Sequence, residues 1–182
     1  MIKIISRKSD LAIIQAKLVG KSISRSNPSL SIEYLYKDTK GDIDLTTPLS
    51  KLPEIGVFTS DLRESLIEND ADIAVHSWKD LPIKLEKGTS VVGTLPRADM
   101  RDVLLVKKNK IDSIKKNKLI KISSSSPRRS YNISAFLNKA VPFDLNEISF
   151  KDIRGNIPTR LNKFISDESD GIVLAKAALD RI

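Results

Sequence analysis

Short β-branched runs alternate with amphipathic segments along this chain of 182 residues. The β-branched runs are MIKIIS (1–6), SIEYLY (31–36), ADIAV (71–75), SVVGTL (90–95), DVLLVKK (102–108), LIKISS (119–124) and GIVLA (171–175). Helices are expected after Ser9, after Thr59 or Ser60, after Ser126, from about Pro158, and over AKAALDRI (175–182). Strands that alternate with helices predict an α/β fold built on parallel strands.

The composition limits the class of protein. Hydrophobic residues make up 40% and aromatic residues 5%, which predicts a globular chain with an aliphatic core. No apolar run reaches the length of about 18 residues that crosses a bilayer, and the N-terminus lacks the apolar region of a signal peptide, so we expect a cytoplasmic protein. Because the sequence contains no cysteine, a disulfide, a thiolate metal site and a cysteine nucleophile are excluded from this chain.

The formal net charge of +8 favours anionic partners. Nucleic acid is one such partner, but aromatic residues are too sparse to stack on bases and no nucleic-acid motif is present. We therefore expect a small anionic molecule as the partner, rather than nucleic acid or a membrane.

Two segments organise the chain. PRADMRD (96–102) is typical of a hinge and predicts one domain over 1–95 and a second over 96–182. The polar stretch 37–56, interrupted by glycine and proline, is typical of a functional lid or of a disordered segment.

Four polar clusters are expected where strands end and helices begin. They are Ser6–Ser9, His76–Asp80, Ser123–Arg129 and Arg154–Asn156, the last with Arg160 close behind. In parallel α/β folds, ligands gather at such positions, where helix N-termini present free N–H groups. Because guanidinium groups match carboxylates, arginines around the acidic Asp80 predict a polycarboxylated substrate with a nitrogen or cationic centre.

Each cluster also has a purely structural explanation. Ser9 and Ser126 suit helix caps, and His76 lacks the neighbouring ligands of a metal site, so no metal is expected. Lys79 and Asp80 by themselves would form only a weak surface ion pair. The functional interpretation depends on arginine or lysine recurring beside hydroxyls or small residues in all four clusters.

The motifs around these clusters resemble the porphobilinogen deaminase family, also called hydroxymethylbilane synthases. The matching stretches are SRKSDLAIIQA, KGDIDLTTPLSKLPEIGVF, ADIAVHSWKDLP, PRADMRDVLL, SSSSPRRS and RGNIPTRL, in the family's order. The resemblance implies a two-lobed fold like that of type II periplasmic-binding proteins, with a mixed sheet in each lobe. It also implies a cytoplasmic transferase of porphyrin, heme and tetrapyrrole biosynthesis.

The activity that the resemblance implies is the stepwise condensation of four porphobilinogen units into a linear tetrapyrrole, with release of ammonia. The growing product would be carried by a dipyrromethane cofactor. Porphobilinogen is then the small-molecule partner, and a monomer is expected.

The resemblance also implies residue roles. Asp80 would be the catalytic carboxylate, which stabilises positive pyrrole nitrogens and assists proton transfer. Acetate and propionate groups of the cofactor would be bound by Arg7, Ser9, Lys79, Ser125, Ser126, Arg128, Arg129, Arg154 and Arg160. Those of the substrate would be bound by Arg7, Arg128, Arg154, Arg160 and Arg181, with Arg97 a further candidate. Lys51 and Phe58 fall in the lid, and Trp78 is expected to pack beside the end of its strand.

The sequence departs from the family's pattern in three places. The lid reads Pro53-Glu54-Ile55-Gly56 where the family has Gly-Gly-Lys-Gly, which removes flexibility and one positive charge. Ser123 replaces a glycine, so strain is expected there if the backbone requires a positive φ. Pro158 replaces a small residue near a helix start, where proline is tolerated.

The resemblance covers the whole chain but only somewhat over half of a family member. The sequence ends at Ile182, before the expected segment that returns to complete domain 1, and before a third domain with the cysteine that holds the cofactor. We therefore expect a fragment that is inactive in isolation. A non-catalytic two-lobed module for small carboxylates is the alternative, although such a receptor gains nothing from Asp80.

Overall fold

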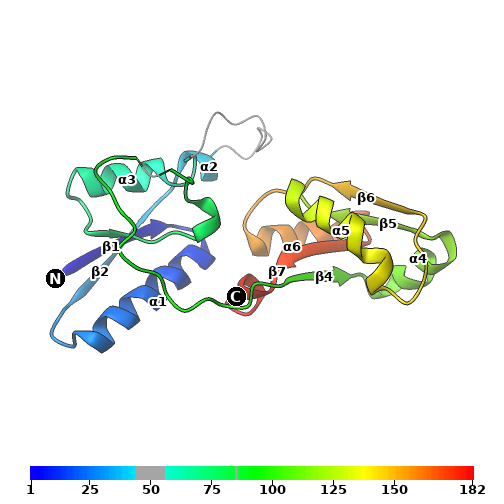
Figure 1. Cartoon of the computed structure of the whole chain (residues 1–182), viewed down its shortest axis with the longest axis horizontal. Helices are drawn as coiled ribbons and strands as arrows, with labels where there is room; N and C mark the ends of the chain where they lie inside the picture. The colour runs from blue at the N-terminus through cyan, green and yellow to red at the C-terminus, as the bar shows by residue number, and fades with distance from the viewer. Residues whose placement is uncertain (44–55, 85) are drawn as a thin grey trace. The chain divides into compact units, whose positions relative to one another are not determined.

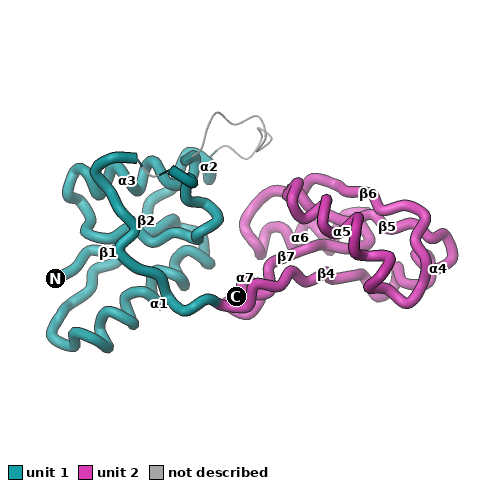
Figure 2. The backbone as a smooth tube through the Cα atoms, viewed as in Figure 1, with its two compact units in different colours: residues 1–97, 182 teal, residues 98–181 magenta. Residues whose placement is uncertain are grey.

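The computed structural model describes residues 1–43, 56–84 and 86–182, which fold into two α/β units (Figure 1). Unit 1 comprises Met1–Arg97 and Ile182, and unit 2 comprises Ala98–Arg181 (Figure 2). Each unit has its own sheet, which confirms the predicted α/β class.

Unit 1 is built on a three-stranded sheet in the order β2-β1-β3. Its elements are β1 (Ile2–Arg7), α1 (Asp10–Ser26), β2 (Ile32–Lys37), α2 (Lys40–Ile43), α3 (Ser60–Ile67), β3 (Ile73–Ala74) and the 3₁₀ turn η2 (Trp78–Asp80). The central strand β1 is parallel to both neighbours, and Ile4 is paired with Tyr34 on one side and Ile73 on the other. The carboxyl ends of β1, β2 and β3 therefore lie at one edge of the sheet.

Successive residues of β1 supply opposite faces of the sheet because side chains alternate along a strand. Ile5 packs with Leu62 of α3 and with Ala71, and Ile4 is fully buried. Figure 1 shows α1 and α3 on opposite sides of these strands. The two helices therefore cover opposite faces of the parallel sheet.

Unit 2 contains a four-stranded sheet in the order β4-β7-β5-β6. Its elements are β4 (Asp102–Val106), the 3₁₀ turn η3 (Lys108–Lys110), α4 (Ile111–Asn117), β5 (Leu119–Ser123), α5 (Pro127–Ala140), β6 (Glu147–Lys151), α6 (Ile157–Ser166), β7 (Gly171–Ala175) and α7 (Lys176–Leu179). β5 is parallel to β6 and β7, whereas β4 runs antiparallel to β7.

The unit 2 core has two layers, one on each face of this sheet. Val173 joins Ile122 and Leu137 in one cluster, whereas its neighbours Ile172 and Leu174 join Phe164 of α6 in the other. The alternation along β7 therefore places α5 and α6 on opposite faces.

Helix starts follow the sequence closely. α5 begins at Pro127 with Ser126 as its N-cap residue, as predicted, although the Ser126 side chain makes no capping hydrogen bond. α6 begins at Ile157, one residue before the predicted start, because the Asn156 side chain accepts a hydrogen bond from the Thr159 backbone N–H at 2.9 Å.

Three expectations require correction. The described strand pairs of unit 1 are all parallel, since helical crossovers join its strands, so a mixed sheet is found in unit 2 alone among the described residues. SVVGTL (90–95) forms no strand, and Val92 is 84% exposed. Ser123 is not strained, because positive φ among described non-glycine residues occurs at Asn69 and Lys118.

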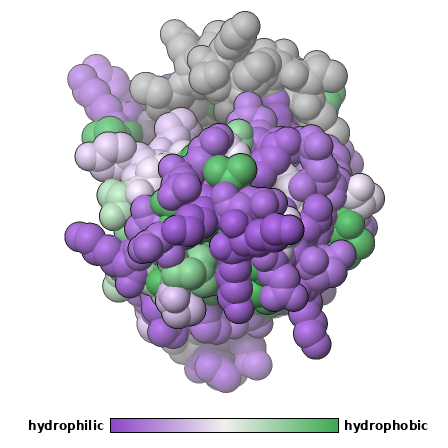
Figure 3. Space-filling model, turned by 90° about the vertical axis from the view of Figure 1, so that its right-hand side faces the viewer, coloured by the Kyte–Doolittle hydropathy of each residue, from purple (hydrophilic) through white to green (hydrophobic). Residues whose placement is uncertain are grey.

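The surface agrees with the charged composition. Figure 3 shows a face that is mainly hydrophilic, with apolar residues scattered over it. None of the helices in the described segments is both long and apolar enough to span a bilayer.

Candidate functional site

Unit 2 gathers four arginines from two helix starts. Arg128 and Arg129 lie in the first turn of α5, Arg154 precedes α6, and Arg160 lies within α6. We call Arg128, Arg129, Arg154 and Arg160 the arginine cluster. These residues follow the carboxyl ends of the parallel strands β5 and β6, the edge at which α/β sheets bind ligands.

The pKa of Arg160 shows that positive charges in the cluster lie close to one another. Burial lowers the pKa of Arg160, and the nearby positive charges of Arg129 and Arg154 lower it further. Its Nε donates a hydrogen bond of 2.7 Å to the Gly155 carbonyl, which fixes the side chain against its own loop. Three guanidinium groups that raise one another's energy make a site that a carboxylate would stabilise.

Ser125 joins the loops that carry these arginines. Its hydroxyl donates to the Ile153 carbonyl at 2.8 Å and accepts from the Ile153 backbone N–H at 2.7 Å. The loop after β5 is thereby fastened to the loop after β6. The single hydroxyl proton of Ser125 is used in this contact, so only its backbone N–H is left to donate to a ligand.

Gly155 shapes the loop before α6. Its φ is +118°, and a Cβ at this position would lie 2.7 Å from the Thr159 side chain. Glycine is therefore required by both the backbone and the close approach. This turn orients Arg160, whose Nε binds the Gly155 carbonyl.

Arg7 is the arginine that the sequence predicts as a site residue at the end of the first strand of unit 1. It is the last residue of β1, and its guanidinium lies 4.4 Å from the centre of the Phe58 ring. Nε donates to Asp42 Oδ2 at 2.9 Å, and Nη2 pairs with Asp42 Oδ1. Thr39 also donates to Asp42, from its backbone N–H at 3.1 Å and its hydroxyl at 2.7 Å.

These contacts govern the charge of Asp42. Burial by itself would raise the pKa of Asp42, but hydrogen bonds from Arg7 and Thr39 outweigh burial and hold the pKa below its usual 3.8. Gly41 permits this arrangement because a Cβ there would lie 2.3 Å from the Phe58 ring. Sequence reasoning missed Asp42, although its position in the polar stretch beside Gly41 marked a turn.

The segment after β3 carries Asp80. Asp80 and Lys79 lie in η2, where Asp80 is half-buried and Lys79 is exposed. Ser77 anchors the turn, since its hydroxyl donates to Gln15 of α1 at 3.0 Å. Trp78 is 68% exposed, so the expectation that it packs beside the strand end is wrong: the 3₁₀ turn leaves this side chain in solvent.

His76 reports what surrounds this segment. Burial lowers the pKa of His76, nearby Asp80 raises it and Arg7 lowers it, and the net shift is downward. The structure therefore brings Arg7, His76 and Asp80 together at the carboxyl edge of the unit 1 sheet. Because its pKa is below 6.5, His76 is neutral near pH 7, and it places an uncharged polar ring near Asp80.

The remaining candidates are less constrained. Ser9 is the N-cap residue of α1 without a side-chain capping bond. Arg97 is exposed, and Arg181 follows α7 but is not among the charges that shift the Arg160 pKa. Phe58 packs on Arg7 and Gly41, whereas Lys51 and Pro53–Ile55 lie outside the described residues.

The sheets and these strand-end clusters define an α/β protein with sites suited to carboxylates. A protein-family model described as "Porphobilinogen deaminase, dipyromethane cofactor binding domain" matches residues 2–182. The chain therefore belongs to the porphobilinogen deaminase family, which confirms the resemblance.

Curated relatives agree with this assignment. The chain is 43% identical over 185 residues to the porphobilinogen deaminase of Bacillus pumilus and 40% identical over 183 residues to that of Bacillus velezensis. It is 38% identical over 183 residues to the probable porphobilinogen deaminase of Picrophilus torridus. All three alignments cover 100% of this chain but 55%, 55% and 60% of the relatives, so the chain spans about half their length.

Proposed function

We propose that the protein containing this chain is a hydroxymethylbilane synthase, a transferase that joins porphobilinogen units into a linear tetrapyrrole with release of ammonia. The observation that supports this most directly is the arginine cluster, in which Arg129 and Arg154 lower the pKa of the half-buried Arg160. Acetate and propionate groups on every pyrrole unit would bring negative charge to these arginines. Family membership supports the same substrate class.

The residues of the chain fit a dipyrromethane cofactor through its carboxylates. The cluster arginines, Ser126 and the backbone N–H of Ser125 would hold those groups in unit 2, and Arg7, Ser9 and Lys79 would do so in unit 1. Bound dipyrromethane would supply the pyrrole carbon to which new units are joined. The chain has no cysteine, so it offers no thioether attachment of its own.

Asp80 would carry the chemistry in unit 1. As a carboxylate at the edge of the sheet, it would stabilise a positive pyrrole nitrogen and move a proton there. Arg7 and Lys79 would orient the substrate carboxylates around it. Arg128, Arg154, Arg160 and Arg181 would do the same in unit 2, and Lys51 and Phe58 would belong to a lid that excludes water.

The finer architecture follows the same proposal. Unit 1 would represent domain 1 (1–95) and unit 2 domain 2 (96–182), in an arrangement like that of type II periplasmic-binding proteins. A cytoplasmic monomer that binds neither nucleic acid nor a membrane suits a small polycarboxylated substrate.

The test is turnover by the protein expressed from its complete native reading frame. We expect porphobilinogen consumption with release of ammonia, and a loss of at least about 100-fold in Asp80→Asn, because the positive intermediate loses its counter-charge. The exposed Asp70→Asn is the matched control in the same unit. Binding without turnover would support the non-catalytic carboxylate module instead, and an active Asp80→Asn variant would refute the role of Asp80.

A further inference from the structure

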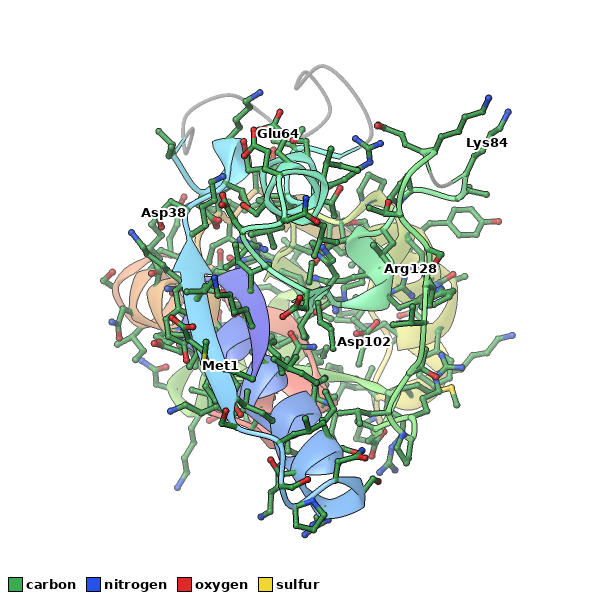
Figure 4. All side chains as sticks on the ribbon, turned by 90° about the vertical axis from the view of Figure 1, so that its left-hand side faces the viewer. Met1, Asp38, Glu64, Lys84, Asp102 and Arg128 are labelled. Atoms are coloured by element: carbon green, nitrogen blue, oxygen red, sulfur yellow. The ribbon has the colours of Figure 1, made fainter. Side chains whose placement is uncertain are left out.

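Asp102 is a carboxylate in direct contact with the arginine cluster. Its Oδ1 accepts a hydrogen bond from Arg129 Nε at 3.0 Å and forms an ion pair with Arg129 Nη2 at 2.9 Å. Its Oδ2 lies 3.5 Å from Arg128 Nη2, and Figure 4 labels both Asp102 and Arg128. One acidic side chain thus holds two consecutive arginines of the first turn of α5.

Strand direction explains how Asp102 reaches this place. β4 is the antiparallel strand of unit 2, and its first residue, Asp102, is paired with Ala175, the last residue of β7. Because β7 is parallel to β5 and β6, the start of β4 lies at the carboxyl edge of the other three strands. The arginine-bearing loops follow that same edge.

Asp102 does not neutralise the arginines that it contacts. It provides one negative charge against the two positive charges of Arg128 and Arg129. Arg129 donates one hydrogen bond to Asp102, from Nε, and its guanidinium has further N–H donors for another acceptor. The side chain of Arg129 is only 15% exposed, so its orientation is fixed by these contacts and by packing.

We propose that Asp102 is a positioning residue, which orients Arg129 and restrains Arg128 so that their remaining donors face a ligand carboxylate. This rests on the proposed function of the cluster as a carboxylate site. As a negative charge, Asp102 by itself repels an anion. Asp102 favours binding only through its effect on arginine orientation. Because repulsion and orientation have opposite effects on affinity, removing the charge of Asp102 tests the proposal.

The experiment titrates the 182-residue chain with porphobilinogen while side-chain N–H signals of arginine are followed by ¹H–¹⁵N NMR. Loss of a signal in Arg129→Lys assigns the Arg129 Nε–H. We expect Asp102→Asn to shift this signal, to speed its exchange with water and to weaken porphobilinogen binding about 10-fold, as expected for a lost charge-assisted hydrogen bond. Asp102→Glu should restore most of the affinity.

The controls separate positioning from folding and from simple charge. Asp144→Asn removes an exposed carboxylate of the same unit and should leave affinity unchanged. Thermal unfolding of each variant identifies any loss of folding. If Asp102→Asn is unfolded, Asp102→Glu tests the proposal instead, because it should recover both the Arg129 signal and porphobilinogen binding.

The outcomes distinguish this inference from the function on which it rests. Equal or tighter binding by folded Asp102→Asn would overturn the positioning role while the carboxylate site stands, since only the repulsion would then have been removed. Failure of Asp102→Glu to restore binding would also overturn it. If the unaltered chain does not bind porphobilinogen, the carboxylate site and the role of Asp102 both fail.

Discussion

Asp42 binds the guanidinium of Arg7 along one edge, through Nε at 2.9 Å and through Nη2, while the ring of Phe58 lies against the guanidinium. Arg7 is thus held on an edge and on a face before any ligand is present. A ligand carboxylate has access only to the Nη edge that Asp42 leaves free, unless it displaces Asp42.

Asp42→Asn is expected to lower the free energy of unfolding by about 2 kcal/mol, because the half-buried Arg7 guanidinium loses its charged acceptor. Urea denaturation of the chain measures this change. Asp38→Asn is the matched control, because Asp38 forms an exposed pair with Lys8 that contributes little. Equal losses in the two variants would contradict a special role for the Arg7–Asp42 pair.

Acid is expected to destabilise the chain in two stages. The folded pKa of His76 is below its usual 6.5, so between those values the unfolded chain binds a proton that the folded chain does not, and stability falls as pH drops below about 6.5. The folded pKa of Asp42 is also lowered, so its contribution is present above about 3.8 and is lost as pH falls through the folded pKa.

Urea midpoints measured from pH 7.5 to pH 3 test both stages, with values chosen to span the usual pKa of each group. His76 is the single histidine of the sequence, so His76→Gln should flatten the first stage and leave the second. The slopes of urea midpoint against pH are compared, rather than the midpoints themselves, so that a packing defect in the variant does not affect the result. A parent midpoint that does not change between pH 7 and pH 5 would contradict the burial of His76.

Gly155→Ala is expected to destabilise unit 2 by about 1–2 kcal/mol, because alanine must adopt a positive φ and meet Thr159. Gly93→Ala is a suitable control, because a Cβ there would have no heavy atom within 4 Å. Chemical denaturation compares the two variants. Since the Gly155 carbonyl holds Arg160, weaker porphobilinogen binding is expected to accompany the loss.

Ser123→Gly, which restores the residue usual in the family, is expected to destabilise this protein by about 1–2 kcal/mol. The buried Ser123 hydroxyl donates to Ser169 at 2.8 Å, and Ser123 ends β5 without a positive φ. Glycine would therefore lose a buried hydrogen bond and gain backbone entropy in the unfolded chain. Thermal unfolding provides the measurement, and a stabilised variant would show that the expected strain is present.

Local patterns predicted most of the fold, because short β-branched runs and helix caps act through neighbouring residues. Pro127 marks a helix start as expected from its sequence environment, and α6 begins within one residue of the start expected at Pro158. SVVGTL (90–95) has the composition of a strand but no described strand partner, and composition cannot supply pairing.

The arginines of the site were predictable, but the acids that hold them were not. Asp42 lies 35 residues from Arg7, and Asp102 lies 27 residues from Arg129. Such pairs depend on strand order and direction, which one sequence does not specify. The antiparallel direction of β4 was the missing information for Asp102, since a parallel β4 would have placed it at the opposite edge.

The two hydrogen bonds between Ser125 and Ile153 have a consequence for recognition. They connect the two loops that carry the arginines. The free-energy cost of bringing these positive charges together is therefore met when unit 2 folds, before a ligand binds. A polyanionic ligand would then bind to arginines that are already in place, and its negative charges would reduce the repulsion between them. The affinity of the arginine cluster for a ligand should thus depend more on the number of acidic groups on the ligand than on conformational change in the protein.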